Sequence, residues 1–400
     1  DNMEDNLRKL VKENTIHEKY KLNNASQLGT QLGLSRNWIS QYLNEYYNDG
    51  TFIKINTRPV VFLDREALEE KYSIRVDKNL LTSFDELRTI IQGQNTADFE
   101  KLIGQKGSLR DVVDKCKASI SYPPHGLPTL LYGPTGTGKS SIAAMMYEYG
   151  INHKILKDNA AFLHVNCSEY ANNPELITAN LFGYKKGAFT GADHEKSGLV
   201  EKADGGILFL DEVHRLPSEG QEMLFYLIDK GMYRKLGETD NTRTARLLII
   251  AATTEDLDSY LLTTFRRRIP MLIDLPPLSE RPLLERLMII KAFLFQEALR
   301  IQQNIILERD ALRLLLNYPC PGNIGQLRSD IQVACARSFL KHITYGDEQL
   351  IIALDDLPPH VGNLALNTAS RESRKLCESD LFVSCQENSW RIWDRISISS

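Results

Sequence analysis

A glycine-rich segment that ends in a lysine and a serine carries the strongest chemical signal in the sequence. Residues 133–140 read Gly-Pro-Thr-Gly-Thr-Gly-Lys-Ser and fit the pattern G-x-x-x-x-G-K-[ST]. An apolar strand-like run, 129–132, precedes the segment, and a helical stretch, 141–149, follows it. Glycines permit a tight loop whose amides, with the positive end of the helix, surround phosphates. The pattern predicts a nucleotide phosphate site, with a ligand-free glycine turn as the alternative.

Within this segment, residue types assign separate tasks. Lys139 is expected to reach the β and γ phosphates of ATP, and the Ser140 hydroxyl to ligate Mg²⁺. The residues expected to bind the nucleotide are Gly133, Pro134, Thr135, Gly136, Thr137, Gly138, Lys139, Ser140 and Ser141.

Two carboxylates follow a second apolar run, 207–210. A run of this kind directs Asp211 and Glu212 to the carboxyl edge of a parallel sheet, where ligands bind. Asp211 is expected to hold the magnesium shell through water, and Glu212 to polarise the attacking water as a general base. A pair of solvated loop acids is the alternative.

Composition limits the class of protein that carries these motifs. The chain has 400 residues, 42% of them hydrophobic and 25% charged, with a net charge of −4. These values are typical of a globular protein and not of disorder, and no apolar run reaches the roughly 18 residues of a membrane span. Six cysteines without metal-ligand spacing predict free thiols in a reducing cytosol, so we expect a cytoplasmic protein without membrane contact.

The pattern of apolar and polar residues changes several times along the chain, and these changes indicate its domain organisation. Strand-like runs alternate with helical stretches through the middle of the chain, a pattern typical of an α/β fold with a parallel sheet. Helical stretches then dominate, and the end is polar. We predict a small domain at 1–75, a linker at 76–98, an α/β nucleotide-binding subdomain at 99–278, a helical lid at 279–355 and a tail or truncated further domain at 356–400.

An insertion separates the strand that ends near Asn166 from the strand that ends at Asp211. These strands are about 45 residues apart, far more than one crossover helix needs. The insertion contains Gly-Ala-Phe-Thr-Gly-Ala at 187–192, whose glycines frame an aromatic and a hydroxyl side chain. The composition alone indicates a surface loop suited to touching a partner.

These ordered motifs resemble the AAA+ P-loop ATPases over about residues 99–355. The hexapeptide matches in full the loop of the sigma-54-dependent enhancer-binding activators. The resemblance implies a ring-shaped homo-oligomer, a hexamer, with Mg-ATP between subunits and a loop that engages sigma-54 RNA polymerase. The implied contact residues are Gly187, Ala188, Phe189, Thr190, Gly191 and Ala192.

The same resemblance suggests roles for four further residues. Asn166 would hydrogen bond the catalytic Glu212, with a plain loop cap as the alternative. Thr253 would sense the γ-phosphate, and Arg267 is favoured among three consecutive arginines as a finger that reaches a neighbouring subunit.

The fourth role concerns the lid. The sensor arginine of the family is absent, because Gly325 stands in its place, and Arg328, one helical turn later, would substitute for it.

Two segments look more like one branch of this family, the levanase-operon regulators. They are Arg-Arg-Ile-Pro at 267–270 and Gly-Asn-Ile-Gly-Gln at 322–326. The branch implies control by sugar phosphotransferase proteins through domains that follow the ATPase, and no such domain is recognisable in this sequence.

The residue pattern of the first domain predicts that it contacts double-stranded DNA at an upstream enhancer site. Residues 25–43 form two helical stretches joined at Gly33, and the strand pair within 51–63 would add a wing. The residues expected to face DNA are Ser35, Arg36, Asn37, Ser40, Gln41 and Arg58. Residues 1–75 hold 11 basic and 11 acidic side chains, so several linked copies would be needed for firm binding. A protein-interaction module is the alternative.

The sequence therefore predicts an AAA+ ATPase preceded by a winged helix-turn-helix domain, acting as a transcription activator. Two other functions remain open at this point. One is a DNA-binding switch that uses ATP only to set its oligomeric state, and the other is an AAA+ protein unfoldase.

Overall fold

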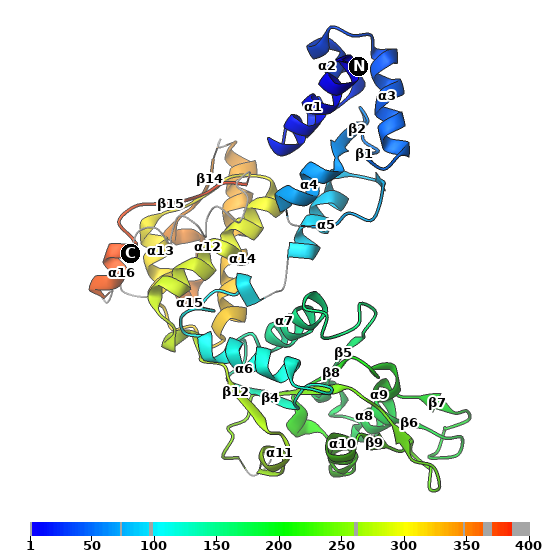
Figure 1. The fold of residues 1–400 in the computed structure, drawn as a ribbon. Helices are drawn as coiled ribbons and strands as arrows, with labels where there is room; N and C mark the ends of the chain where they lie inside the picture. Colours follow the sequence, from blue (N-terminus) through cyan, green and yellow to red (C-terminus); the bar gives the residue numbers. More distant parts are fainter. Residues whose placement is uncertain are drawn as a thin grey trace. The chain divides into compact units, whose positions relative to one another are not determined.

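The computed structural model describes residues 2–72, 74–95, 99–259, 263–346, 349–362 and 370–385. The chain divides into two compact units, 1–98 and 99–400 (Figure 1).

The first unit packs helices around a three-stranded sheet. Strand order is β2-β1-β3, with β1 antiparallel to β2 and parallel to β3. Its elements are α1 Asn2–Ile16, α2 Ala25–Leu32, α3 Arg36–Asn48, β1 Phe52–Ile55, β2 Val61–Asp64, α4 Arg65–Tyr72, β3 Leu80–Leu81 and α5 Phe84–Asn95.

Helices α2 and α3 meet at a tight turn. Gly33 ends α2 in the left-handed conformation at φ 66°, and the Ser35 hydroxyl caps α3 by accepting from the Trp38 amide at 3.3 Å. Leu28, Ile39 and Leu43 are fully buried between these helices, α1 and the sheet. The turn at Gly33 therefore matches the sequence expectation.

The segment expected to be a linker, 76–98, belongs to this unit. Strand β3 pairs with β1, and Leu81 and Leu87 are buried in the same cluster as Ile53. The prediction was wrong here because a two-residue strand has no detectable period in the sequence.

The second unit contains a five-stranded parallel sheet with the order β12-β4-β11-β8-β5. Its strands are β4 Thr129–Tyr132, β5 Phe162–Asn166, β8 Ile207–Asp211, β11 Leu248–Thr253 and β12 Met271–Asp274. Alternate residues of β8 enter different cores: Leu208 and Leu210 face one, whereas Ile207 and Phe209 face the other. The sheet is thus buried on both faces, as its continuous apolar runs predict.

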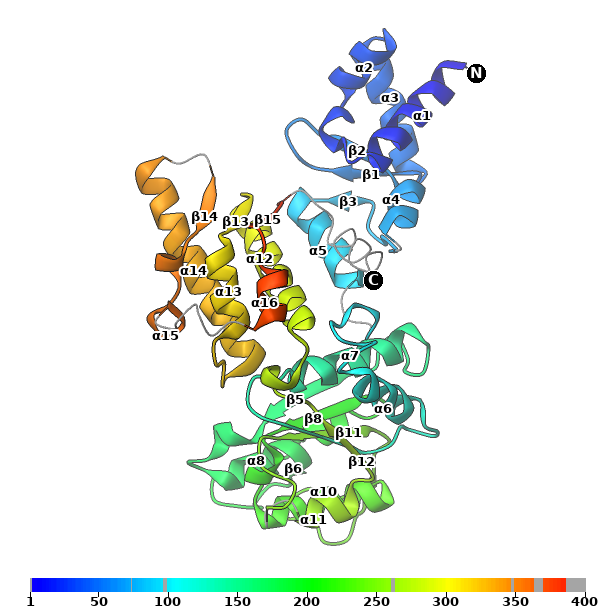
Figure 2. The same cartoon turned by 90° about the vertical axis from the view of Figure 1, so that its left-hand side faces the viewer.

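Helices cover both faces of this sheet (Figure 2). Helices α6 Arg110–Ser121 and α7 Lys139–Asn152 pack on one face, and α8 Pro174–Phe182 and α10 Ser218–Lys230 on the other. Shorter elements of this subdomain are β6 Gly183–Tyr184, β7 Lys196–Ser197, α9 Leu199–Lys202, β9 Met232–Tyr233, β10 Arg243–Thr244 and α11 Thr263–Arg268. Its 3₁₀ helices are η2 Phe99–Lys101, η3 Cys167–Tyr170 and η4 Val213–Arg215.

The lid combines helices with a small sheet of order β14-β13-β15. Its elements are α12 Leu283–Ile301, β13 Ile305–Leu307, α13 Arg309–Asn317, α14 Asn323–Tyr345, β14 Leu350–Ile352, α15 Pro359–Gly362, α16 Arg371–Leu376 and β15 Leu381–Val383. The remaining 3₁₀ helices are η1 Tyr20–Leu22 in the first unit, and η6 Leu278–Glu280 and η7 Leu354–Asp356 here.

The polar end of the chain was expected to be a tail from 356, yet much of it packs in the lid. Cys377 and Val383 are buried in the lid core, and β15 pairs with β13. Three-residue strands that pair across more than 70 residues leave no local signal, which explains the wrong prediction. The rest of that segment, 363–369 and 386–400, lies outside the described residues.

No helix in the described ranges is long and apolar enough to cross a membrane. All six cysteines are free, and four of them are buried.

Candidate nucleotide site

A pocket of about 490 Å³ opens at the carboxyl ends of β4, β5, β8 and β11, between the α/β subdomain and the lid. Its walls bring together motifs that are far apart in the sequence. The lining residues are Thr135, Gly136, Gly138, Lys139, Ser140, Ser141, Asn166, Ser168, Asp211, Glu212, Thr254, Ile324, Gly325 and Arg328. The structure thus assembles the predicted phosphate loop and the two carboxylates in one place.

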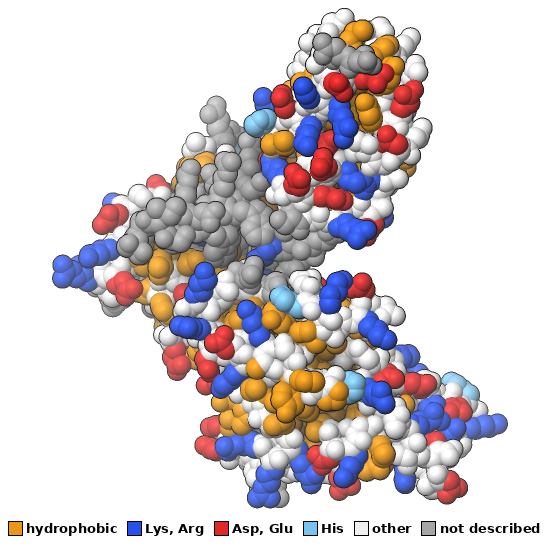
Figure 3. Space-filling view, in the orientation of Figure 1, with side chains coloured by type: hydrophobic (Ala, Val, Ile, Leu, Met, Phe, Trp, Pro, Cys, Tyr) orange, Lys and Arg blue, Asp and Glu red, His pale blue; other side chains and the backbone are white. Residues whose placement is uncertain are grey.

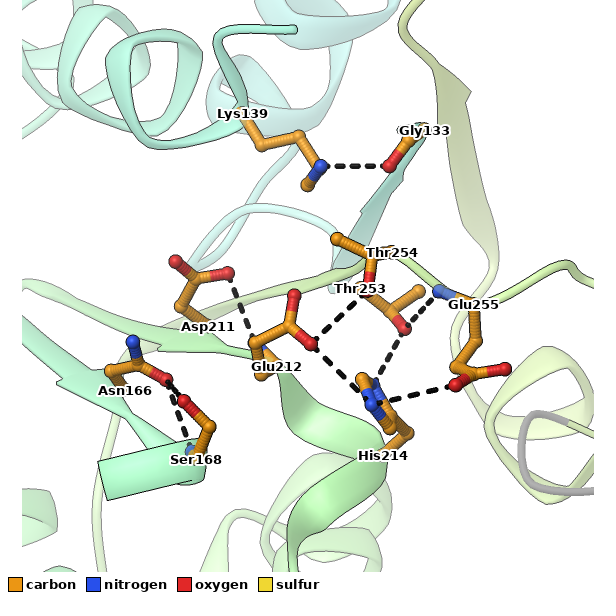
Figure 4. Close-up of polar contacts among 10 residues, drawn as sticks. All are labelled: Gly133, Lys139, Asn166, Ser168, Asp211, Glu212, His214, Thr253, Thr254 and Glu255. Atoms are coloured by element: carbon orange, nitrogen blue, oxygen red, sulfur yellow. Dashed lines mark hydrogen bonds and ion pairs between the residues drawn. The ribbon is translucent and has the colours of Figure 1, made fainter. Parts of the chain in front are cut away.

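The phosphate loop passes from β4 directly into α7, as its sequence predicts. Lys139 is buried, and its ammonium donates to the carbonyl of Gly133 at 2.7 Å (Figure 4). It also donates to the carbonyl of Pro134 at 2.9 Å. Burial lowers the pKa of Lys139, while the negative charges of Asp211 and Glu212 oppose that shift. The lysine therefore lies beside the loop whose amides would face a phosphate.

The lid holds the other side of the same loop. Asn323 is buried; its amide nitrogen donates to Thr135 O at 3.0 Å, and its amide oxygen accepts from Leu278 N at 2.8 Å. Arg281 is also buried, and it donates to Thr137 O at 3.1 Å. Sequence reasoning missed both residues, because these three partners are more than 40 positions away along the chain.

Gly136 marks the closest approach of loop and lid. Its φ is 78°, and an added Cβ would overlap the carbonyl oxygen of Gly322. Gly325 N donates to Gly136 O at 3.2 Å across this contact. Glycine is required here both for the left-handed backbone and for the space that the lid occupies.

Glu212 is held in an unusual backbone conformation at the end of β8. Its φ and ψ are 51° and 47°, a left-handed region that costs a residue with a side chain roughly 1–2 kcal/mol. The Glu212 amide donates to Asp211 Oδ1 at 2.9 Å. Glu212 Oε2 lies 3.2 Å from the donor Thr254 Oγ1 and 3.4 Å from His214 Nε2. Several contacts therefore fix the carboxylate that was expected to act as a base.

Asn166 lies on the pocket wall. It was expected to hydrogen bond Glu212, but in this structure it has another partner. Its Oδ1 accepts from Ser168 N at 3.0 Å and from Ser168 Oγ at 2.7 Å, which caps η3 (Figure 4). No hydrogen bond joins Asn166 and Glu212 among the contacts of the described residues. The cap, the alternative that the sequence left open, is the arrangement in this structure.

The two threonines at the end of β11 make different contacts, although only Thr253 was expected to sense the γ-phosphate. Thr253 is 0% exposed and is absent from the pocket lining, and its hydroxyl lies 2.9 Å from His214 Nδ1. Thr254 lines the pocket and donates to Glu212. Because side chains alternate along a strand, the residue after the buried one faces the ligand edge. Thr254 is therefore the residue of this pair that lines the pocket, and sensing of the γ-phosphate by Thr253 stays a prediction.

The three arginines of α11 differ in their partners. Arg266 donates to Asp258 at 3.0 Å, and Arg268 forms an ion pair with Asp229. Arg267 is exposed and forms no ion pair with any described residue. Of the three, it is the side chain most available to another molecule.

Arg328 lines the pocket from α14, and its guanidinium lies 5.0 Å from the centroid of the Phe293 ring. Gly325, the position where a sensor arginine was expected, lies on the same wall one turn earlier. The structure thus brings both positions to the pocket, with a cation only at the second.

Two oxygen donors expected to hold Mg²⁺ share the pocket. The Ser140 hydroxyl belongs to the first turn of α7, and Asp211 ends β8. Mg²⁺ is usually bound through one or two protein oxygens, with water and substrate phosphates completing its shell. The residues present fit that ion.

The insertion forms an arm whose base is the antiparallel pair β6 and β7. Phe189 is 37% exposed and packs edge-on against the ring of Tyr184 at 4.9 Å, and Thr190 is exposed. Ala192 was predicted to be a contact residue. It is only 4% exposed, so it does not belong to the accessible surface of the arm. Charged side chains of both signs surround the arm (Figure 3).

An ion cluster, in which Lys235 is buried and Glu195 is exposed, connects the arm to the segment between β9 and β10. Glu195 Oε1 accepts from Lys185 at 2.9 Å and from the buried Lys235 at 2.8 Å. These two lysines, Lys235 foremost, lower the pKa of Glu195 to about 2. The ion pairs fix the root of the arm while its tip stays exposed.

The residues expected to face DNA gather on α3 and the β1–β2 turn. Arg36, Asn37, Gln41 and Arg58 are exposed, and Ser40 is half-buried. Ser35 is exposed as well, and its hydroxyl is used as the cap of α3.

Comparison with known proteins agrees with this geometry. Residues 102–274 match the family model described as Sigma-54 interaction domain. The chain is 42% identical over 364 residues to the transcriptional regulatory protein LevR of Bacillus subtilis, an alignment that covers 90% of this chain and 39% of LevR. It is 44% identical over 333 residues to the transcriptional regulatory protein DagR of Salmonella typhimurium, covering 82% of this chain and 35% of DagR. The chain thus spans about two fifths or less of these relatives.

Among solved structures, the chain is similar to NtrX from Brucella abortus in complex with ATP. The TM-score is 0.53 at 23% identity, and the match covers 78% of this chain and 65% of that one. At that identity the likeness shows the fold alone, a parallel sheet covered by helices and followed by a lid.

Proposed function

Because the chain belongs to the sigma-54 interaction domain family through residues 102–274, and is a relative of the LevR and DagR regulators, we propose that it is an ATP-hydrolysing transcription activator. The observation that carries this proposal is the single pocket wall shared by the phosphate loop, Asp211 and Glu212.

The phosphates of ATP would lie against the amides of the loop and the start of α7, where the helix dipole favours negative charge. Lys139 exchanges its two carbonyl partners for the β and γ phosphates. Ser140 and Asp211 would hold Mg²⁺, which when bound would neutralise charge on those phosphates.

Glu212 takes a proton from the attacking water. The water oxygen bonds to the γ-phosphorus, its proton moves to Glu212, and the bond to the β,γ-bridging oxygen breaks, so that its electron pair stays on ADP. Exposure of Arg267 supports its role as a finger in the site of a neighbouring copy, in a ring-shaped homo-oligomer, a hexamer in this family. Arg328 contributes charge from the lid of the same protomer.

The exposed tip at Phe189 and Thr190 supports contact with the sigma-54 RNA polymerase. Residues Gly187, Ala188 and Gly191 shape the loop that presents them. ATP turnover would change the position of this loop and so remodel the polymerase complex.

Transcription from a sigma-54 promoter with purified polymerase tests this proposal. We expect RNA with ATP, none with a non-hydrolysable analogue, and none with Thr190→Ala, which should retain ATPase turnover. Thr344→Ala, at an exposed threonine at the end of α14, is the matched control and should behave as the parent. Turnover without any transcript would instead favour an unfoldase or another ATP-driven regulator.

For the first unit we propose a winged helix-turn-helix that binds double-stranded DNA at an enhancer. The capped α3 with exposed Arg36 and Asn37, and the β1–β2 turn with Arg58, support it. Removing one phosphate contact should reduce the salt slope of binding by about 0.9. Arg36→Ala should therefore weaken binding, whereas Lys9→Ala, on α1, should not. Equal loss in both variants would argue for non-specific attraction only.

Control of sugar phosphotransferase genes, and regulation by phosphotransferase proteins, are proposed from the likeness to LevR alone.

A further inference from the structure

A buried histidine stands behind the pocket, between the end of β8 and the end of β11. His214 lies in η4, and its side chain is 3% exposed. Its Nε2 lies 3.4 Å from Glu212 Oε2 and 3.8 Å from Glu255 Oε1, and its Nδ1 lies 2.9 Å from Thr253 Oγ1 (Figure 4). The imidazole therefore bridges the candidate base and a hydroxyl that does not reach the pocket.

The partners decide which ring nitrogen carries the proton. The carboxylates of Glu212 and Glu255 only accept hydrogen bonds, so the nitrogen that faces them, Nε2, is the donor. Thr253 Oγ1 already accepts from Glu255 N at 3.1 Å, and its own hydrogen is free to donate to Nδ1. A ring with a proton on Nε2 satisfies the carboxylates in this chain of contacts.

This arrangement commits one oxygen of Glu212 and leaves the other available. Oε2 faces two donors, Thr254 Oγ1 and His214 Nε2. The hydrogen bond from Thr254 and the close approach of the ring nitrogen hold Oε2 in place, so Oε1 is the oxygen that can receive a proton from water. Because His214 is buried, water cannot take the place of the ring beside Oε2.

We propose that His214 is a positioning residue for ATP hydrolysis: oriented by Thr253, it holds Oε2 of Glu212 so that Oε1 faces the attacking water. This inference rests on the proposed ATPase function. His214 itself touches neither nucleotide nor water and acts only through Glu212.

Three substitutions in the full chain separate orientation from packing. His214→Gln can still place a donor near the position of Nε2, His214→Asn reaches only the position of Nδ1, and His214→Leu fills the space without any donor. A hydrogen bond to a charged group is worth about tenfold to a hundredfold in rate. We expect kcat to fall by that factor in the Leu and Asn variants and by only a few-fold in the Gln variant, with ATP affinity within about twofold of the parent in all three.

A matched control and a double-mutant cycle complete the test. His153→Asn changes an exposed histidine at the end of α7 and should leave kcat unchanged. Thr253→Val should lower kcat, and adding His214→Asn to it should lower kcat little further, because both changes break one chain of contacts. Thermal unfolding of each variant measures any loss of packing separately.

The tautomer gives a readout that is independent of turnover. In ¹⁵N spectra of labelled histidines, the signal lost in His214→Gln should be that of a ring protonated at Nε2. A ring without a proton on Nε2 would overturn the proposal, as would kcat in His214→Leu equal to the parent, or a loss that appears only in ATP affinity or in unfolding. Absence of ATP turnover in the parent would overturn the proposed function and this role together, whereas parental turnover with an unaffected Leu variant would overturn only the role of His214.

Discussion

The phosphate loop and the tip of the β6–β7 arm are both short loops in which glycines adopt positive φ, yet their surroundings differ. At Gly136 an added Cβ would overlap the backbone of the lid, whereas at Gly191, with φ 95°, nothing lies within 4 Å of it. The polar atoms beside the first loop are paired within the protein, as for Lys139 and Glu212, but Phe189 and Thr190 at the arm tip are exposed. Glycine thus allows close packing against the lid in the phosphate loop, whereas in the arm tip it serves only the backbone conformation.

The largest effect should come from the pocket. Glu212→Gln removes the general base, and we expect kcat to fall by about 10²–10⁴ while ATP binding persists. Steady-state ATPase assays and nucleotide titration measure both quantities. Glu219→Gln, at an exposed glutamate of α10, is the control. Full turnover in Glu212→Gln would show that Glu212 is not the general base. The chemical difference between the two loops would then be lost.

Exchanging each glycine for alanine tests the comparison directly. Gly136→Ala combines backbone strain with a clash against the lid, so we expect the free energy of unfolding to fall by about 2–5 kcal/mol and ATP affinity to drop. Gly191→Ala adds only strain, of about 1–2 kcal/mol, and should not change ATP affinity. Chemical denaturation and nucleotide titration of both variants decide the matter; equal losses would show that the two loops do not differ in this respect.

Truncating the aromatic at the tip should have a smaller effect on the fold. Phe189→Ala loses a half-exposed contact with Tyr184, which is worth about 1 kcal/mol or less, and turnover should stay within about twofold. If ATP turnover by Phe189→Ala were strongly reduced, the tip would be part of the hydrolysis machinery and not only a contact surface.

The smallest effect concerns pH at the root of the arm. Because the pKa of Glu195 is lowered to about 2, mainly by Lys235, its ion pairs contribute stability above the ordinary glutamate pKa of about 4.3. That contribution should persist at pH 4 and disappear as the pH falls through 2. A ¹³C titration of the Glu195 carboxyl measures the midpoint, and a midpoint near 4.3 would contradict the ion cluster.

Much of the site could be predicted from the sequence, because its motifs are continuous. The phosphate loop lies between β4 and α7, and Asp211 ends β8. Both lie at the positions that the apolar runs of the sequence predicted. The capped turn before α3 is also local, since Ser35 and Trp38 are three residues apart.

The differences from the sequence expectations share one physical cause. Whether Thr253 or Thr254 faces the pocket depends on the register of β11 between β4 and β8, which no local pattern fixes. The short strands β3 and β15 pair with β1 and β13, and neither has a detectable period of its own. Asn166 caps η3 instead of reaching Glu212, a choice between two partners that only the packed structure makes.

By itself, the sequence determined which chemical groups this protein possesses and which of them lie next to one another along the chain, since loop and cap geometry follow from a few neighbouring residues. Only the tertiary structure decided how those groups are held. Glu212 is fixed by Thr254, 42 positions away, and the phosphate loop by Asn323, 188 positions away from Thr135. Such contacts depend on strand order and on lid packing, and these are properties of the whole folded unit.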